Sequence, residues 1–110
     1  MDKIKLRIYQ DENGDKPFLD WLQGLKDRST RARVQVRLDR VEEGNLGDHK
    51  ALGGGLWELR LSFGPGVRIY FGRDGDEWIV LLVGGDKRSQ RRDIEKARIY
   101  WADYLMRGGK

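Results

Sequence analysis

The stretch from Leu56 to Lys87 constrains the fold more than any other, because it predicts three consecutive strands of one sheet. Odd positions from 57 to 63 carry Trp, Leu, Leu and Phe while even positions are polar, the pattern of a strand with one buried face. The same alternation returns at 67–71, after a Gly-Pro-Gly turn. The third run, WIVLLV at 78–83, is apolar on both faces and predicts a central strand that is covered on both sides.

Pairing Phe63 with Val67 across the turn sets the predicted register of the first two strands. This register places Arg60 opposite Tyr70 and puts Arg68 on the diagonal from Arg60, about 7–8 Å away along the sheet. Two arginines at that separation are within reach of one phosphate group. The face that they share is expected to carry Glu58, Arg60, Arg68 and Tyr70.

The second turn, Asp74-Gly75, is a strong hairpin signal because both residues tolerate positive φ. Pairing Arg73 with Asp76 predicts that Phe71 shares a face with the even residues of the third strand, Trp78, Val80 and Leu82. The other face of that strand, which a last helix is expected to cover, carries Ile79, Leu81 and Val83. The arginine face stays open over the first two strands, so the sequence predicts a groove with a basic wall.

The N-terminal part supplies one more strand and two helices. Alternation at 3–9 predicts a one-sided strand, and Pro17 begins a short helix, since proline suits the first helical position. The segment 27–44 fits both a strand and a helix. Its length, its charge and an N-cap at Ser29 or Thr30 favour the helix.

A glycine-rich linker, Asn45–Gly55, is expected before the meander, and Ser89 is the predicted N-cap of a last helix. The apolar stripe of that helix is predicted to be Ile94, Ala97, Trp101, Tyr104 and Leu105. Basic residues in its first turn oppose the helix dipole, at a cost of about a few tenths of a kcal/mol each, which hints that they bind a ligand. The expected fold class is α+β: a small antiparallel sheet of one N-terminal strand plus a three-strand meander, two N-terminal helices and one C-terminal helix.

Composition narrows the function classes. The 110 residues predict one domain over 1–110, with a single hydrophobic core. The absence of cysteine excludes disulfides and cysteine-ligated metals, and a lone histidine argues against a histidine-ligated metal. The sequence lacks a signal-like N-terminus and any apolar run of about 20 residues, so a cytoplasmic protein without a membrane partner is expected.

The net charge is +4, and the placement of the basic residues matters more than this excess. Arg60 and Arg68 face the predicted groove, and the cations suited to contacting an RNA backbone are Lys50, Arg88, Arg91 and Arg92. For a basic patch alone, an ordinary solvated face is the commoner explanation.

Several segments together resemble a known group. The runs GLWELRLSFGPGVRIYF, LLVGGDK and SQRRDIEKA, with KPFLDWL and GNLGDHKALGGG before them, are similar to the addiction-module killer proteins, HigB-like members of the RelE/ParE toxin superfamily. The resemblance implies a type II toxin that cleaves mRNA, usually in the ribosomal A site. It also implies a cognate antitoxin, commonly with a helix-turn-helix domain, and a toxin–antitoxin hetero-oligomer.

The resemblance assigns catalytic roles to three basic residues, Arg60, Arg68 and Lys87, which match the basic positions of RelE-type nucleases. Glu58 stands where the RelE pattern has a lysine, and Ile94 stands near a position where some relatives have a tyrosine or histidine. The implied reaction needs no metal or cofactor. Candidates for proton transfer are Tyr70, Glu58 and His49.

Two other functions stay open at this point. ParE-like members of the superfamily bind and inhibit DNA gyrase without nuclease residues, and a plain RNA-binding module would hold RNA without cutting it. Each candidate residue also has a structural interpretation: Arg60 and Glu58 as exposed strand residues, His49 as a solvated loop residue, and Tyr70 as cover for the sheet edge.

Overall fold

The computed structural model describes residues 3–109, so residues 1, 2 and 110 of the predicted domain lie outside the described part. Its strands are β1 (Lys5–Ile8), β2 (His49–Gly53), β3 (Leu56–Leu61), β4 (Val67–Asp74) and β5 (Trp78–Asp86). Its helices are α1 (Pro17–Gly24), α2 (Arg28–Glu42), the short 3₁₀ helix η1 (Lys87–Ser89) and α3 (Gln90–Met106). The predicted α+β class is confirmed.

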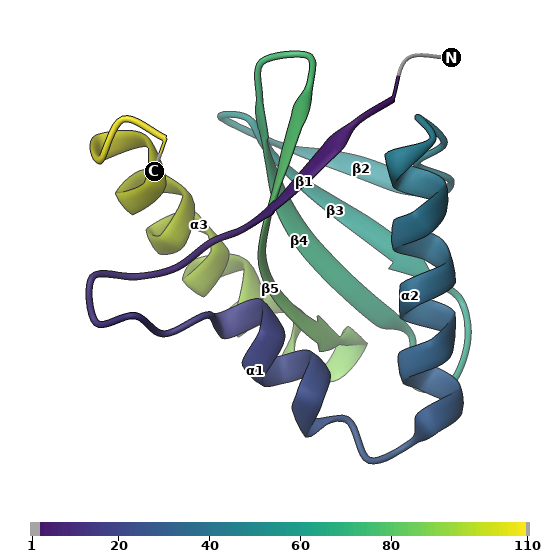
Figure 1. The fold of residues 1–110 in the computed structure, drawn as a ribbon. Coiled ribbons are helices and arrows are strands. Elements are labelled where there is room, and N and C mark those ends of the chain that lie inside the picture. Colours follow the sequence, from purple (N-terminus) through teal and green to yellow (C-terminus); the bar gives the residue numbers. More distant parts are fainter. Residues whose placement is uncertain (1–2, 110) are drawn as a thin grey trace.

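The strands form one sheet in the order β1-β5-β4-β3-β2 (Figure 1). The segment β2–β5 is an antiparallel meander, whereas β1 joins β5 in parallel. The parallel pairing is available because two helices and three strands separate β1 from β5 along the chain. Therefore β5 is an interior strand of the sheet, and β1 and β2 are its edge strands.

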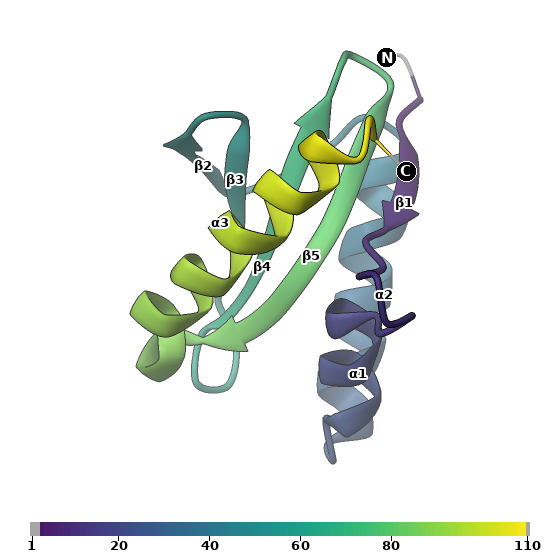
Figure 2. The ribbon, with the colours of Figure 1, turned by 90° about the vertical axis from the view of Figure 1, so that its left-hand side faces the viewer.

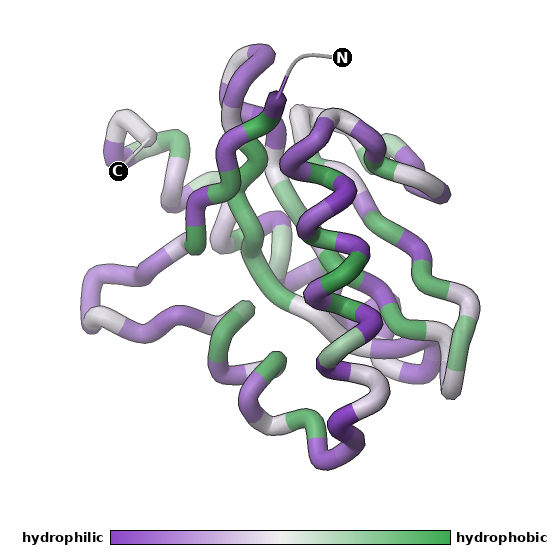
Figure 3. The backbone as a smooth tube through the Cα atoms, turned by 45° about the vertical axis from the view of Figure 1, so that its right-hand side comes forward, coloured by the Kyte–Doolittle hydropathy of each residue, from purple (hydrophilic) through white to green (hydrophobic). Residues whose placement is uncertain are grey.

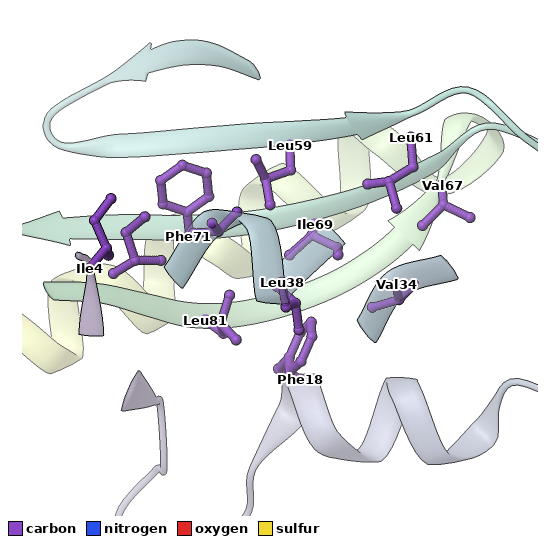
Figure 4. Packing of buried hydrophobic residues seen from close by; sticks show 12 residues of the cluster. Ile4, Phe18, Val34, Leu38, Leu59, Leu61, Val67, Ile69, Phe71 and Leu81 are labelled. Atoms are coloured by element: carbon purple, nitrogen blue, oxygen red, sulfur yellow. The ribbon is translucent and has the colours of Figure 1, made fainter. Parts of the chain in front are cut away.

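Helices cover both faces of the sheet. Figure 2 shows α3 on one face, with α1 and α2 on the other. The core under α1 and α2 joins Phe18, Val34 and Leu38 to Ile69 and Leu81, as Figure 4 shows. The second core lies under α3 and contains Tyr70, Val80, Leu82, Ala97, Trp101 and Tyr104. Along α2 hydrophilic and hydrophobic segments alternate (Figure 3), as expected for a helix with one buried stripe.

The predicted linker was wrong in part, because residues 49–53 form the edge strand β2. This strand pairs antiparallel with β3, with Ala51 opposite Trp57, and its register shifts between Ala51 and Gly53. Four of its five residues are exposed. An exposed edge strand held by backbone pairing has no apolar alternation, so the sequence carried no signal for it.

The register predicted for β3 and β4 was wrong by two positions. Leu61, not Phe63, lies opposite Val67, because residues 62–66 form a longer turn in which the Gly66 N–H donates to the Phe63 carbonyl (3.0 Å). A shift of two leaves every side chain on its predicted face. It does, however, move Arg60 directly opposite Arg68.

The register predicted for β4 and β5 was wrong by an odd number of positions, so the faces of β5 are exchanged. Asp74 lies opposite Trp78, with three residues rather than two between the strands. The face toward α1 and α2 carries Ile79 and Leu81, and the face toward α3 carries Val80, Leu82 and Val83. A bulge between Tyr70 and Phe71 lets the adjacent residues Leu82 and Val83 share one face.

The helices form where predicted, with corrections at their ends. Asp27, rather than Ser29 or Thr30, caps α2 by accepting the Ser29 N–H (2.9 Å). Ser89 is the N-cap residue of α3 but makes no side-chain cap bond, and Leu105 is 52% exposed rather than part of the stripe. Among residues 3–109, none of these helices has the length and apolar character needed to span a membrane.

Candidate functional site

Two arginines face each other across neighbouring strands. Arg60 on β3 lies directly opposite Arg68 on β4, and Arg68 lies opposite Gly85 on β5. Like charges in directly opposed positions destabilise a sheet, unless something else compensates for them. The partners of each arginine therefore decide whether this pair costs stability.

The arginines line a hollow of about 450 Å³ together with Asp48, Lys87 and the turn at 62–66. We call this the arginine hollow. The Lys87 stem lies across Gly66: a Cβ at Gly66 would come within 2.9 Å of Lys87 Cγ. Gly66 also has a φ of +83°, which favours glycine. The turn glycine thus allows Lys87, which begins η1, to lie against the hollow beside two strand residues.

Arg68 is buried without an anionic partner among residues 3–109. It is 8% exposed, and its one hydrogen bond runs from Nη1 to the carbonyl of the adjacent Val67 (3.0 Å). Its Nε has no partner among the described residues, and none of the ion pairs within 3–109 includes it. A buried charge without a counter-ion is costly. An oxyanion in the hollow would remove that cost, and the planar guanidinium suits a phosphate.

Arg60 is held in place by a fully buried carboxylate. Glu58 is 0% exposed, and it accepts hydrogen bonds from Arg60 Nε (3.0 Å) and from Gln90 Nε2 on α3 (2.8 Å). The bond uses only Nε of Arg60, so within the described chain both terminal nitrogens of its guanidinium are left for a ligand. The side chain of Arg60 is 35% exposed and lines the hollow.

Tyr70 lies opposite Glu58 and is 0% exposed. Burial, followed by the charge of Glu58, raises the pKa of the Tyr70 hydroxyl, which therefore stays protonated near neutral pH. The geometry does not complete a hydrogen bond from this hydroxyl to any described residue. Tyr70 and Glu58 are thus both out of contact with solvent, and neither lines the hollow.

His49 and Lys50 lie on the exposed edge strand. His49 pairs with Leu59, so its side chain is on the face opposite Arg60, and its ring lies 5.5 Å from that of Trp57. Lys50 pairs with Glu58 and is on the arginine face. The structure therefore separates His49 from the predicted basic residues.

The other predicted RNA contacts follow the hollow along η1 and α3. Arg88 pairs with Asp86 (3.2 Å) and its side chain is 83% exposed. Arg91 and Arg92 are exposed at the start of α3, and Arg92 lines a separate hollow of about 920 Å³ between α1 and α3. That second hollow also carries several acidic residues, among them Asp20 and Asp93, which sets it apart from a phosphate site.

Sequence reasoning missed two residues in the region first taken for helix and linker. Asp48 lines the arginine hollow. Arg37 on α2 donates to three backbone carbonyls: Leu46 from Nε (2.8 Å), Arg60 from Nη1 (2.9 Å) and Asp48 from Nη2 (2.6 Å). No pattern in the sequence marks a side chain that binds main-chain atoms brought together by folding.

Comparison with known proteins gives two matches. Residues 20–107 match the profile of a family described as Phage derived protein Gp49-like (DUF891). The chain is also 38% identical over 82 residues to a protein of Haemophilus influenzae that is described as uncharacterized. The alignment covers 74% of this chain and 83% of that protein. The family match includes every strand from β2 to β5 and all the residues of the arginine hollow.

Proposed function

Because this chain belongs to the phage-derived Gp49-like family, a RelE/HigB-type toxin family, we propose that it is a HigB-like toxin that cleaves mRNA. The family is associated with the toxins of toxin–antitoxin systems. The proposed activity is that of a metal-independent endoribonuclease that acts on mRNA held in the ribosome. We also propose that residues 1–110 are one toxin domain and that the protein acts in the cytoplasm.

The observation that carries the proposal is the buried, unpaired guanidinium of Arg68. Its side chain lacks a counter-ion within residues 3–109, and it lines a hollow that two further cations, Arg60 and Lys87, also line. A nucleic-acid phosphate supplies the missing anion, and arginine can donate to it bidentately.

In the proposed reaction the 2′-hydroxyl attacks the neighbouring phosphate and the 5′-oxygen leaves. Arg68 contacts the scissile phosphate and stabilises the extra charge of the phosphorane, with Arg60 and Lys87 on either side. Glu58 and Gln90 position Arg60 from below. The ribosome holds the mRNA in a reactive geometry, so the protein needs few groups for proton transfer.

The proposed partners follow from the same assignment. They are the ribosome with its mRNA, and a cognate antitoxin, of helix-turn-helix type, that forms a hetero-oligomer with the toxin. Lys50, Arg88, Arg91 and Arg92 are exposed and are proposed to contact the RNA backbone around the hollow.

The test is induced expression in cells, followed by primer extension on an abundant mRNA, for wild type and Arg68→Ala. Wild type should cut within translated codons, and Arg68→Ala should lose these cuts while still binding the antitoxin. Arg28→Ala is the matched control, because it removes one exposed arginine at the start of α2, outside the hollow. It should cleave as wild type does.

Other outcomes identify other functions. Growth arrest with intact mRNA would contradict the nuclease and favour a ParE-like inhibitor of DNA gyrase. Retention of intact RNA without arrest would favour a plain RNA-binding module. Circular dichroism and antitoxin binding show whether Arg68→Ala is folded, and Arg68→Lys, which keeps the charge but loses the bidentate geometry, gives a second variant.

A further inference from the structure

We propose that Asp48 accepts the proton of the attacking 2′-hydroxyl, an inference that rests on the nuclease function proposed above. Within the described residues 3–109, Asp48 is the single carboxylate-bearing residue among those that line the arginine hollow. Its side chain is exposed, so substrate can reach it. The three cations of the hollow can bind a phosphate, and phosphate binding requires no carboxylate. The carboxylate of Asp48 is therefore available for proton transfer.

Asp48 continues the row of the two arginines across the sheet. Its carbonyl accepts the backbone N–H of Arg60 (2.9 Å), one residue before the pairing of His49 with Leu59 begins β2. The row therefore runs from Asp48 through Arg60 to Arg68. The carboxylate of Asp48 takes part in none of the ion pairs found within the described chain, although its charge acts on the nearby Arg37 guanidinium.

Arg37 fixes the backbone that carries this carboxylate. Its guanidinium joins the carbonyls of Asp48 and Leu46 to that of Arg60, which binds the loop before β2 to the strand β3. Gly47 makes the close approach possible, because it has a φ of +71° and a Cβ there would come within 3.0 Å of the Arg37 guanidinium. The position of Asp48 relative to Arg60 is thus set by main-chain contacts from two sides. Arg37 is a positioning residue in this scheme.

The earlier candidates for proton transfer are less well placed. Glu58 and Tyr70 are both 0% exposed, so neither contacts a ligand in the hollow in this conformation. His49 is on the opposite face of the sheet, where its ring packs near Trp57 and its Nδ1 lies 2.7 Å from the Gly47 carbonyl. Asp48 is the neighbour of His49 in sequence but has the correct face.

The proposed step balances in atoms and charge. A carboxylate oxygen of Asp48 takes the 2′-hydroxyl proton as the 2′-oxygen forms a bond to phosphorus. The bond from phosphorus to the 5′-oxygen breaks, and that oxygen leaves with the electron pair and takes a proton from solvent. Asp48 then releases its proton to solvent, and the products are a 2′,3′-cyclic phosphate and a 5′-hydroxyl end.

The test measures single-turnover cleavage of mRNA in programmed ribosomes by the full-length protein, at neutral pH, for wild type and Asp48→Asn. The charged groups that face Asp48 are Arg37, Arg60, Arg68 and Lys87, with His49 next to it in the chain. Asp48→Asn should lower the rate about 10²-fold or more with little change in the half-saturating ribosome concentration.

Asp48→Asn is expected to fold, because the hydrogen bonds found for Asp48 use its backbone carbonyl. Asp76→Asn is the matched control, an exposed aspartate at the other end of β4, and should keep the wild-type rate. A wild-type rate in Asp48→Asn, beside an inactive Arg68→Ala, would overturn the role of Asp48 alone. Cleavage by Arg68→Ala at the wild-type rate would instead overturn the nuclease site itself.

Discussion

The two arginines of the hollow differ in how the protein treats their charge. Arg60 is neutralised by the buried Glu58, which itself receives a second hydrogen bond from Gln90. Arg68 is more buried than Arg60 and has no acidic partner among residues 3–109. Since a buried ion without a partner is costly, the unpaired guanidinium of Arg68 is the stronger indication of a ligand. The ordered Arg60 then adds a second, oriented set of donors.

The hydroxyl of Tyr9 makes the free energy of unfolding depend on pH in the alkaline range. Its hydroxyl donates to Asp103 Oδ2 (2.6 Å), and burial together with that hydrogen bond raises its pKa to about 12, from 10.0. A raised folded pKa means that the stabilisation is complete below pH 10 and is lost as pH rises from 10 through 12. Tyr9→Phe removes this titration, so its free energy of unfolding should fall less steeply than that of wild type over this range.

Urea unfolding at pH 8, 10, 11 and 12 measures the Tyr9 effect. Phenylalanine keeps the ring that stacks on Tyr100, with centroids 5.2 Å apart, so the comparison isolates the hydroxyl. Burial also raises the pKa of Tyr100 and Tyr104 in both proteins, and both should therefore lose stability at high pH. Parallel curves for the two proteins would show that the pKa of Tyr9 is not raised.

At the scale of elements, α3 docks on the sheet through a glycine. The ring of Trp101 lies on Gly72 of β4, where a Cβ would come within 2.2 Å of Trp101 Cε3. The indole cannot easily shift, because its Nε1 donates to the Gly54 carbonyl (2.8 Å). Gly72→Ala should therefore destabilise the protein by about 1–3 kcal/mol, the usual range for overpacking.

Chemical denaturation of Gly72→Ala, Trp101→Leu and the double variant checks this contact. The double variant should lose less free energy of unfolding than the two single variants added together, since a smaller side chain makes room for the new methyl group. Gly24→Ala is the control, because its Cβ would meet nothing within 4 Å. Additive losses would mean that the strain at Gly72 does not arise from the indole.

The sequence predicted elements better than it predicted their pairing. Alternation at 57–63 and 67–71 identified β3 and β4, because side-chain period depends on local backbone geometry. The prediction of one buried face was wrong for β4, since residues 67–72 are buried on both faces. The register of β4 and β5 depended on the length of the turn between them. Three residues, rather than the predicted two, lie between the paired ends of these strands. One extra turn residue exchanges the faces of a strand. Alternation within the strand contains no information about that count.

The candidate site was predictable to the same extent. Arg60, Arg68 and Lys87 line one hollow, as the strand pattern and the resemblance together led us to expect. The burial of Glu58 could not be predicted, because it depends on Gln90 and the docking of α3. Asp48 was missed for a related reason: it precedes an edge strand that is held by main-chain bonds and shows no side-chain pattern.

In the molecule as a whole, one sheet contributes to two hydrophobic cores and carries the arginine hollow. β4 and β5 contribute one face to the core under α1 and α2 and the other face to the core under α3. The arginine hollow includes the turn between β3 and β4, and these two strands carry Arg60 and Arg68. A disturbance in either core therefore reaches the strands that hold Arg60 and Arg68.

Because the cores share these strands, we expect the chain to unfold as one cooperative unit. Trp21 packs against the first core and over Gly84, and Trp101 belongs to the second. Two variants, each keeping one of these tryptophans and replacing the other three with phenylalanine, should each show a fluorescence midpoint that coincides with its circular-dichroism midpoint.

Leu38→Ala, which removes a buried side chain from the first core only, should destabilise the protein by about 2–5 kcal/mol. That loss should appear equally at Trp101, since β4 and β5 cannot lose one face and keep the other. A Trp101 signal that stayed at its original midpoint would mean that the α3 side folds independently, and that residues 1–110 do not act as a single domain.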